Sequence, residues 1–319
     1  MVPASNASSL PTRRRNPGTP GDGRAPERTT RHFETIVSTK PHDAARSTGA
    51  VPAVDNTDWL KTAAMILVVV DHIGYFFIED YEWWSVLGRW AAPPFFFLLG
   101  YAQTRAVPLT WIWLGIILTL LDSWNTGWTW VAPNILLSFA LIRMARPYVQ
   151  IFAQRYGLAA FTLLVSTLVA VLPLAAIVVD YGSEGWLWAL FGFYQRTHVD
   201  GRSDIGSAGA TQGSTTPPRA MTENVSLMRL LTCLVAAVVY VWQEQQEFLF
   251  SPVHFPVFVL GIGILSIALF HFQRGRSRIQ PPVPIAGTLR FIGHHTLKIY
   301  AIQLAGSELI IILWPGIAP

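Results

Sequence analysis

The sequence predicts an all-α protein, a polytopic bundle of transmembrane helices. Hydrophobic residues make up 51% of the 319 residues and charged residues only 13%, about half the charged share of a soluble domain. Apolar runs recur along the chain, several of them close to the roughly 20 residues that a helix needs to cross a bilayer. Many of the 13 Trp residues stand at the ends of these runs, as expected of aromatic belts at a membrane interface.

About nine apolar runs are candidate spans. They cover approximately residues 59–78, 86–104, 107–121, 131–143, 157–179, 185–195, 226–242, 254–272 and 290–313. We expect the runs at 107–121, 131–143 and 185–195 to be tilted, re-entrant or extended by polar flanks, because each is shorter than a straight span. Pro93 and Pro94 predict a kink in the second run, since proline cannot donate a helical hydrogen bond.

The charges of the connecting loops support this order of spans. Loops that contain arginine alternate with loops that contain Asp and Glu. The basic loops hold Arg105, then Arg143, Arg146 and Arg155, then Arg196, Arg202 and Arg219, and finally Arg274, Arg276 and Arg278. The positive-inside rule therefore predicts that the N-terminus and the basic loops face the cytosol or matrix, in a bacterial or an organelle inner membrane. With nine spans, Pro319 falls on the outer side.

Residues 1–57 form a basic tail that precedes the predicted transmembrane domain, residues 58–319. Residues 1–50 hold eight Lys and Arg against four Asp and Glu, which accounts for the net charge of +4. The tail is rich in Pro, Gly, Ser and Arg, so alone it cannot bury enough apolar surface to offset its ordering entropy. Three interpretations stay open: a disordered cytosolic tail, an organelle-targeting segment, or an extended arm that docks on a neighbouring membrane subunit. A second segment, 197–225, is predicted to be a flexible loop on the inner side.

The pair Asp71-His72 is the most informative feature of the chain. It lies in the apolar run Trp59–Ile78, where a central Asp costs about 2.5–3.5 kcal/mol on insertion scales. If the first two runs are antiparallel neighbours, Arg89 lies at a similar depth. An Asp beside an Arg stays ionised, and a nearby carboxylate favours a basic, oriented imidazole. The competing interpretation is a structural Asp71–Arg89 ion pair with His72 as a bystander.

A second set of polar residues lies on the last apolar run. His295 and Lys298 are three residues apart and share a helix face, and His294 and Arg290 lie nearer its inner end. Together with the basic loop before this run, they form a candidate site for a donor rich in phosphate, such as coenzyme A. The plainer alternatives are that inner loops are basic in most membrane proteins and that Lys298 extends to the interface.

Five motifs along the chain resemble those of a known family. They are LKTAAMILVVVDHIG (60–74), GRWAAPPFFFLLG (88–100), PNILLSFALIRM (133–144), DYGSEGWLWALFGFY (180–194) and IGHHTLKIYAIQL (292–304). In this order they resemble the TraX family of integral-membrane acyltransferases, whose namesake is associated with pilin acetylation. They resemble other polytopic membrane acyltransferases more distantly. The resemblance covers roughly Asp58 to Leu304.

The resemblance implies an acyltransferase that moves an acetyl group from acetyl-CoA to an acceptor amine or hydroxyl. In that interpretation His72 is the base, Asp71 orients it and Arg89 holds charge, since acyl transfer needs a base and a donor for the developing oxyanion. The resemblance also implies roles for residues further along the chain. Asn134 would join His294, His295 and Lys298 in binding the donor, and Asp180, Tyr181, Tyr300 and Gln303 would bind the acceptor. Asn134 as a helix cap and Asp180-Tyr181 as a surface turn are the alternatives.

Two departures from the family pattern leave a second function open. Related enzymes often close the last motif with Tyr-x-x-His, whereas Tyr300 is followed by Gln303; and Ala-Pro-Pro replaces an expected Phe-Pro-Leu. In this second interpretation the chain is a non-catalytic TraX-like subunit of a larger complex, for example in the mitochondrial inner membrane. A transporter is the weaker third interpretation. With one cysteine, Cys233, and no HExxH motif, we expect no metal. Membrane lipids and an acyl-CoA donor are the expected partners, and nucleic acid is not.

Overall fold

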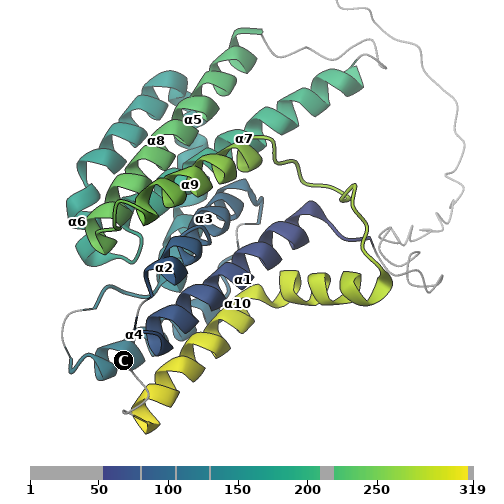
Figure 1. Cartoon of the computed structure of the whole chain (residues 1–319). Helices are drawn as coiled ribbons and strands as arrows, with labels where there is room; N and C mark the ends of the chain where they lie inside the picture. The colour runs from purple at the N-terminus through teal and green to yellow at the C-terminus, as the bar shows by residue number, and fades with distance from the viewer. Residues whose placement is uncertain (1–52, 80, 105, 129–130, 209–218, 315–319) are drawn as a thin grey trace, which may run out of the picture. The chain divides into compact units, whose positions relative to one another are not determined.

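The structure is a computed structural model that describes residues 53–79, 81–104, 106–128, 131–208 and 219–314, without the side chains of residues 202–208, 219–223 and Ala176. In these residues the regular elements are all helices (Figure 1). They are α1 (Asn56–Phe77), α2 (Glu82–Gly88), α3 (Ala92–Tyr101), α4 (Leu109–Asn125), α5 (Ile135–Ala170), α6 (Leu172–Val178), α7 (Gly182–Ala208), α8 (Arg219–Phe248), α9 (His254–Phe270) and α10 (Val283–Leu313). The predicted all-α fold is confirmed. The predicted tail lies almost entirely outside the described residues.

Four of the described helices are long and apolar enough to cross a membrane. They are Asn56–Phe77, Ile135–Ala170, Asn224–Phe248 and Val283–Leu313. The 17-residue helix α9 is also apolar but shorter. Large apolar side chains such as Val238, Leu260 and Ile302 are exposed on the outer faces of these helices. The chain is therefore a membrane protein of the helical-bundle type, and the number of spans stays a prediction.

The second predicted run is broken into two helices. α2 ends at Gly88 and α3 begins at Ala92, with Pro93 and Pro94 in the first turn of α3. Proline fits the first turn of a helix, where the missing N–H would have no helical partner. The predicted interruption is confirmed, and it places Arg89 at the end of a helix within the bundle.

Helix α5 consists of two parts that meet at Gly157. This glycine has φ 51° and ψ −119°, which is not a helical conformation and which glycine adopts without steric cost. A straight helix of 36 residues would extend about 54 Å. Instead, Ser138 near its start donates a hydrogen bond of 2.9 Å to the backbone oxygen of Asp180, ten residues beyond its end. The chain therefore turns back at Gly157, between the segments predicted as separate runs at 131–143 and 157–179.

The predicted loop at 197–225 is partly wrong. Helix α7 continues to Ala208 and α8 begins at Arg219, so helix occupies both flanks of that segment. Residues 209–218 lie outside the described part of the chain. The predicted run at 185–195 is accordingly extended by polar residues to a helix of 27 residues.

The helices pack around an aromatic core. α1 packs against α10 and α2, and α3 packs against α7, which in turn contacts α8 (Figure 1). Fully buried aromatic side chains from three of these helices meet there, among them Phe97, Trp188 and Tyr240. This core holds in place the helix ends that form the site described next.

Candidate active site

A cavity of about 320 Å³ lies among the ends of the helices. Its walls come from the second half of α1, the break between α2 and α3, the end of α4, the start of α5, the α6–α7 connection, the end of α8 and residues 296–308 of α10. Its polar lining residues are Asp71, His72, Tyr75, Arg89, Thr119, Asp122, Asn134, Asp180, Tyr181, Glu247, Thr296, Tyr300 and Glu308. The loop charges predict that the helix ends that meet here lie on the outer side of the membrane, opposite to the basic loops.

Asp71 and Arg89 form an ion pair at the wall of this cavity. Arg89 Nη2 lies 2.9 Å from Asp71 Oδ2, and their side chains are only 15% and 9% exposed. The predicted pairing of consecutive antiparallel helices is confirmed. Because the pair is largely buried, each charge depends on the other.

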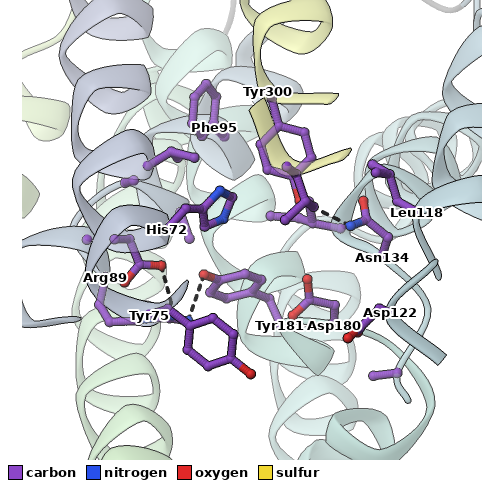
Figure 2. Close-up of a pocket in the computed structure, with 18 of the residues that line it drawn as sticks. His72, Tyr75, Arg89, Phe95, Leu118, Asp122, Asn134, Asp180, Tyr181 and Tyr300 are labelled. Atoms are coloured by element: carbon purple, nitrogen blue, oxygen red, sulfur yellow. Dashed lines mark hydrogen bonds and ion pairs between the residues drawn. The ribbon is translucent and has the colours of Figure 1, made fainter. Parts of the chain in front are cut away.

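Arg89 also polarises a phenol that faces the cavity. Its Nη1 donates a hydrogen bond of 3.1 Å to the hydroxyl oxygen of Tyr181, as Figure 2 shows. Phe248 lies under the guanidinium at 4.3 Å from the ring centroid, and Oε2 of Glu244 lies 3.9 Å from Nε. Arg89 was expected to hold charge at the reacting centre. In the structure Arg89 lines the cavity, where its charge is paired with Asp71 and its Nη1 is hydrogen-bonded to Tyr181.

His72 is held by Gln303 and not by Asp71. Its Nδ1 lies 2.5 Å from Oε1 of Gln303, and the Gln303 amide nitrogen donates to Ser307 Oγ at 3.5 Å. The amide oxygen of Gln303 faces the imidazole, so this contact is a hydrogen bond when Nδ1 carries the proton, and Nε2 is then the basic atom. The expected orienting contact from Asp71 is absent because neighbouring helical residues point about 100° apart.

Asn134 is both a helix cap and a cavity residue. Its Oδ1 accepts a hydrogen bond from the backbone N–H of Leu136 at 3.1 Å, and its Nδ2 donates to the hydroxyl of Tyr300 at 3.1 Å. The Tyr300 ring centroid lies 5.8 Å from that of His72. The cap fixes the amide orientation, so the side chain presents its nitrogen to Tyr300 (Figure 2).

Asp180 and Tyr181 enter the cavity from the connection between α6 and α7. Tyr181 has φ 57°, a conformation that is uncommon for a residue with a side chain and that is often found at functional sites. Burial raises the pKa of the Asp180 carboxyl to about 7, opposed by the charge of Arg89 and by a hydrogen bond from the backbone N–H of Ile135. The segment is a turn, and it also carries two cavity groups.

The comparisons with known proteins bear on this arrangement. The family model described as TraX protein matches residues 56–266, about two thirds of the chain. The chain belongs to the TraX family. Two curated relatives, both named Protein TraX, come from Escherichia coli and Escherichia coli strain K12; they are 33% and 29% identical over 89 residues. Each alignment covers 26% of this chain and 36% of the relative's length. No solved structure matches.

The TraX match includes most of the cavity but not all of it. Asp71, His72, Arg89, Asn134 and the Asp180-Tyr181 segment lie within residues 56–266. The contribution of α10 lies beyond the match, and it includes Thr296, Tyr300 and Glu308. The family match therefore covers His72 and the ion pair, whereas the α10 contacts are known from the structure alone.

Three predicted donor-binding residues do not line this cavity. His294, His295 and Lys298 lie on the first half of α10, and Gln303 is eight residues beyond His295, about 12 Å along the helix. The His294 side chain is 63% exposed, and its Nδ1 contacts the backbone oxygen of Arg290 at 2.8 Å. Of the four predicted donor residues, only Asn134 faces His72's cavity.

Sequence reasoning missed several acidic lining residues. Asp122, Glu247 and Glu308 line the cavity, and Glu308 is hydrogen-bonded to Asn125. Glu308 lies inside the last apolar run, so the argument that singled out Asp71 would also have found it. Within the described residues, no group of three or more His, Cys, Asp or Glu has the arrangement of a metal site.

Proposed function

We propose that the chain is an integral-membrane acyltransferase that moves an acetyl group from acetyl-CoA to an amine or hydroxyl acceptor. One observation carries the proposal: His72 lines a cavity that is also lined by two phenol groups, those of Tyr181 and Tyr300, whose oxygens already accept hydrogen bonds. Acyl transfer from a thioester needs this combination of a base and donors for a developing negative charge.

His72 Nε2 takes the proton of the acceptor. As it does so, the acceptor nitrogen or oxygen bonds to the thioester carbonyl carbon. The tetrahedral intermediate then loses the thiolate as the C–S bond breaks. The proton passes from Nε2 to the thiolate, which leaves as the coenzyme thiol. Gln303 keeps the other ring nitrogen protonated throughout, so Nε2 is available in each cycle.

Tyr181 and Tyr300 supply the oxyanion donors. The oxygen of Tyr181 accepts a hydrogen bond from Arg89, and that of Tyr300 accepts one from Asn134. Each phenol therefore keeps its own O–H to donate to the carbonyl oxygen. A hydrogen bond received from the Arg89 cation polarises the Tyr181 O–H further.

The donor enters from the side that carries the basic loops, which the loop charges predict to be cytosolic or matrix. Its phosphates bind near Arg290, His294, His295 and Lys298. Arg290 and Gln303 are thirteen residues apart on α10, about 20 Å along a straight helix, which an extended thioester arm would cover. The acceptor reaches His72 from the opposite face.

The experiment is acetyl-CoA turnover by the full-length chain in detergent, with an amine acceptor and a hydroxyl acceptor in parallel. We expect turnover by the wild type and a loss of about a hundredfold or more in His72→Ala, the contribution of a general base. His254→Ala is the matched control, since His254 contacts Ser251 and Glu82 and does not line the cavity.

The same experiment tests the alternative of a non-catalytic subunit, which the Gln303 departure favours. Equilibrium dialysis measures acetyl-CoA binding by the wild type and by His72→Ala. If neither of them binds acetyl-CoA, the acyltransferase proposal is wrong and the non-catalytic subunit becomes the favoured function. Equal turnover by wild type and His72→Ala would reject His72 as the base.

A further inference from the structure

One face of α8 is in contact with Arg89. Tyr240, Glu244 and Phe248 are spaced four residues apart, so their side chains lie along one face of this helix. The Tyr240 hydroxyl donates a hydrogen bond of 2.6 Å to the backbone oxygen of Arg89. Glu244 Oε2 lies 3.9 Å from Arg89 Nε, and the Phe248 ring centroid lies 4.3 Å from its Cζ. Three successive turns of one helix therefore contact both the backbone and the side chain of Arg89.

Tyr240 also contacts the phenol that Arg89 polarises. Its ring is stacked on that of Tyr181, with 6.5 Å between the centroids and 14° between the planes. Arg89 Nη1 donates a hydrogen bond of 3.1 Å to the Tyr181 hydroxyl (Figure 2). The same residue of α8 thus contacts the donor residue and the acceptor residue of this hydrogen bond.

Glu244 places an acceptor oxygen beside the guanidinium. Its side chain is only 1% exposed, and within the described residues neither Glu244 Oε2 nor Arg89 Nε has a hydrogen-bond partner. A separation of 3.9 Å is longer than a hydrogen bond, so the contact is electrostatic. A cation and an oxygen at this distance attract more strongly in a buried site than in water. Each atom therefore lowers the free energy that burial of the other costs.

Asp71 offers the guanidinium a competing position. Arg89 makes one contact with it, from Nη2 to Oδ2 at 2.9 Å, and Asp71 Oδ1 has no hydrogen-bond partner in the part of the chain that the structure describes. Arginine and a carboxylate often form two parallel hydrogen bonds. A second bond to Asp71 would turn Nη1 or Nε towards Oδ1 and draw the guanidinium away from Tyr181. Glu244 gives Nε a partner on the α8 side and so opposes this movement.

We propose that Glu244 is a positioning residue, which keeps Arg89 Nη1 on the hydroxyl of Tyr181. Tyr240 and Phe248 act with it on the same face of α8. This role rests on the proposed function, in which Tyr181 donates a hydrogen bond to the oxyanion. Because an oxyanion donor must be fixed before the reaction, a guanidinium that has moved towards Asp71 would leave this donor less polarised.

The test is fluorine NMR of the full-length chain in detergent, with fluorotyrosine incorporated at residue 181 to report on its phenol. Glu244→Met keeps an unbranched side chain of similar volume and removes the acceptor oxygen, whereas Glu244→Gln keeps an oxygen. We expect Glu244→Met to shift the signal and Glu244→Gln to shift it much less. Glu82→Met is the matched control: Glu82 is 48% exposed, contacts His254 and does not line the cavity, so the signal should stay in place.

A background without Arg89 separates positioning from a direct effect of Glu244 on Tyr181. Asp71→Leu/Arg89→Met removes both charges of the ion pair, so that neither is buried alone. In that background Glu244→Met should leave the signal in place. An equal shift with and without Arg89 would overturn the proposal. So would the absence of a shift in the otherwise wild-type chain, or an equal shift in Glu244→Gln and Glu244→Met.

Turnover of acetyl-CoA is the second measurement. Glu244→Met should lower kcat about tenfold with KM unchanged, the effect of weakening one hydrogen bond in the transition state. In a Tyr181→Phe chain the same change should cause no further loss; an equal loss there would show that Glu244 does not act through Tyr181. If the wild type shows no turnover, the proposed function is wrong, and the fluorine signal still decides whether Glu244 positions Arg89.

Discussion

His72 Nδ1 lies 2.5 Å from the amide oxygen of Gln303, a residue 231 positions later in the chain. This contact joins α1 to α10 and gives a reason for the departure at Gln303. The pattern of related enzymes places a histidine at the position of Gln303. This chain has an amide there instead, and that amide holds Nδ1 of His72. The replacement therefore supports a working base at His72 as well as it supports a lost reaction.

Gln303→Leu should lower kcat about tenfold while KM stays unchanged. The change removes one hydrogen bond, a net contribution of about 0.5–1.5 kcal/mol, and each 1.36 kcal/mol in the barrier is tenfold in rate. Gln303→Glu keeps an acceptor for the Nδ1 proton and should retain more activity than Gln303→Leu. Steady-state kinetics with acetyl-CoA checks this; an equal loss in both variants would indicate a packing role.

Asp71→Ala should destabilise the protein by about 3–5 kcal/mol, because it leaves the buried Arg89 cation without its nearer carboxylate. The double variant Asp71→Leu/Arg89→Met should recover most of that loss. Denaturant unfolding in detergent measures both. Arg274→Ala is the control: Arg274 is 64% exposed and lies 3.6 Å from Asp55, so its loss should cost less than about 1 kcal/mol. A double variant no better than the single one would argue against the ion pair.

Tyr181→Phe and Tyr300→Phe should each lower kcat by about a hundredfold or more, the effect of removing one oxyanion donor. Each variant keeps the ring and deletes only the hydroxyl. Tyr194→Phe is the control, since the Tyr194 hydroxyl lies outside the cavity and has no hydrogen-bond partner among the described residues. Acetyl-CoA turnover of the three variants distinguishes an oxyanion role from a general effect of losing a buried hydroxyl.

The sequence predicted those parts of the site that depend on charge. A carboxylate and an arginine inside apolar runs each need a partner in the membrane. The first two runs are joined by a short connection, so the Asp71–Arg89 pair could be predicted directly from the sequence. The same reasoning could not find Gln303 as the partner of His72. A neutral amide costs little to place in a helix, and nothing in the local sequence links residues 72 and 303.

Element boundaries were predicted less well than element types. Apolar periodicity ended at residue 195, so the polar continuation of α7 to Ala208 gave no signal of a helix. The turn at Gly157 was implied by the two predicted runs on either side, yet its antiparallel packing against α7 depends on contacts between Val149, Leu164 and Leu190. Such contacts are set by tertiary packing and not by local propensity.

The stability of the wild type should fall as pH rises from about 4 to 7. Burial raises the pKa of Asp180 to about 7, whereas an Asp in an unfolded chain titrates near 3.9. In this window the folded state holds a proton that the unfolded state releases, so the free energy of unfolding decreases with pH and levels off above 7. The total loss is at most about 4 kcal/mol. Asp180→Asn should remove this component, which thermal unfolding at pH 4–8 measures as a difference between the two forms.

Gly88→Ala should separate α1 from α2 and disturb the ion pair. A Cβ atom at residue 88 would lie 2.1 Å from the Cβ of Asp71, far inside contact distance. Overpacking of this kind costs about 1–3 kcal/mol, and here it displaces the carboxylate that holds Arg89, so turnover should fall together with stability. Gly263→Ala on α9 is the matched control, because no atom lies within 4 Å of its added Cβ. In a helix that change should be neutral or stabilising by up to about 1 kcal/mol. Unchanged unfolding and turnover in Gly88→Ala would show that α1 and α2 do not pack as closely as the structure has them.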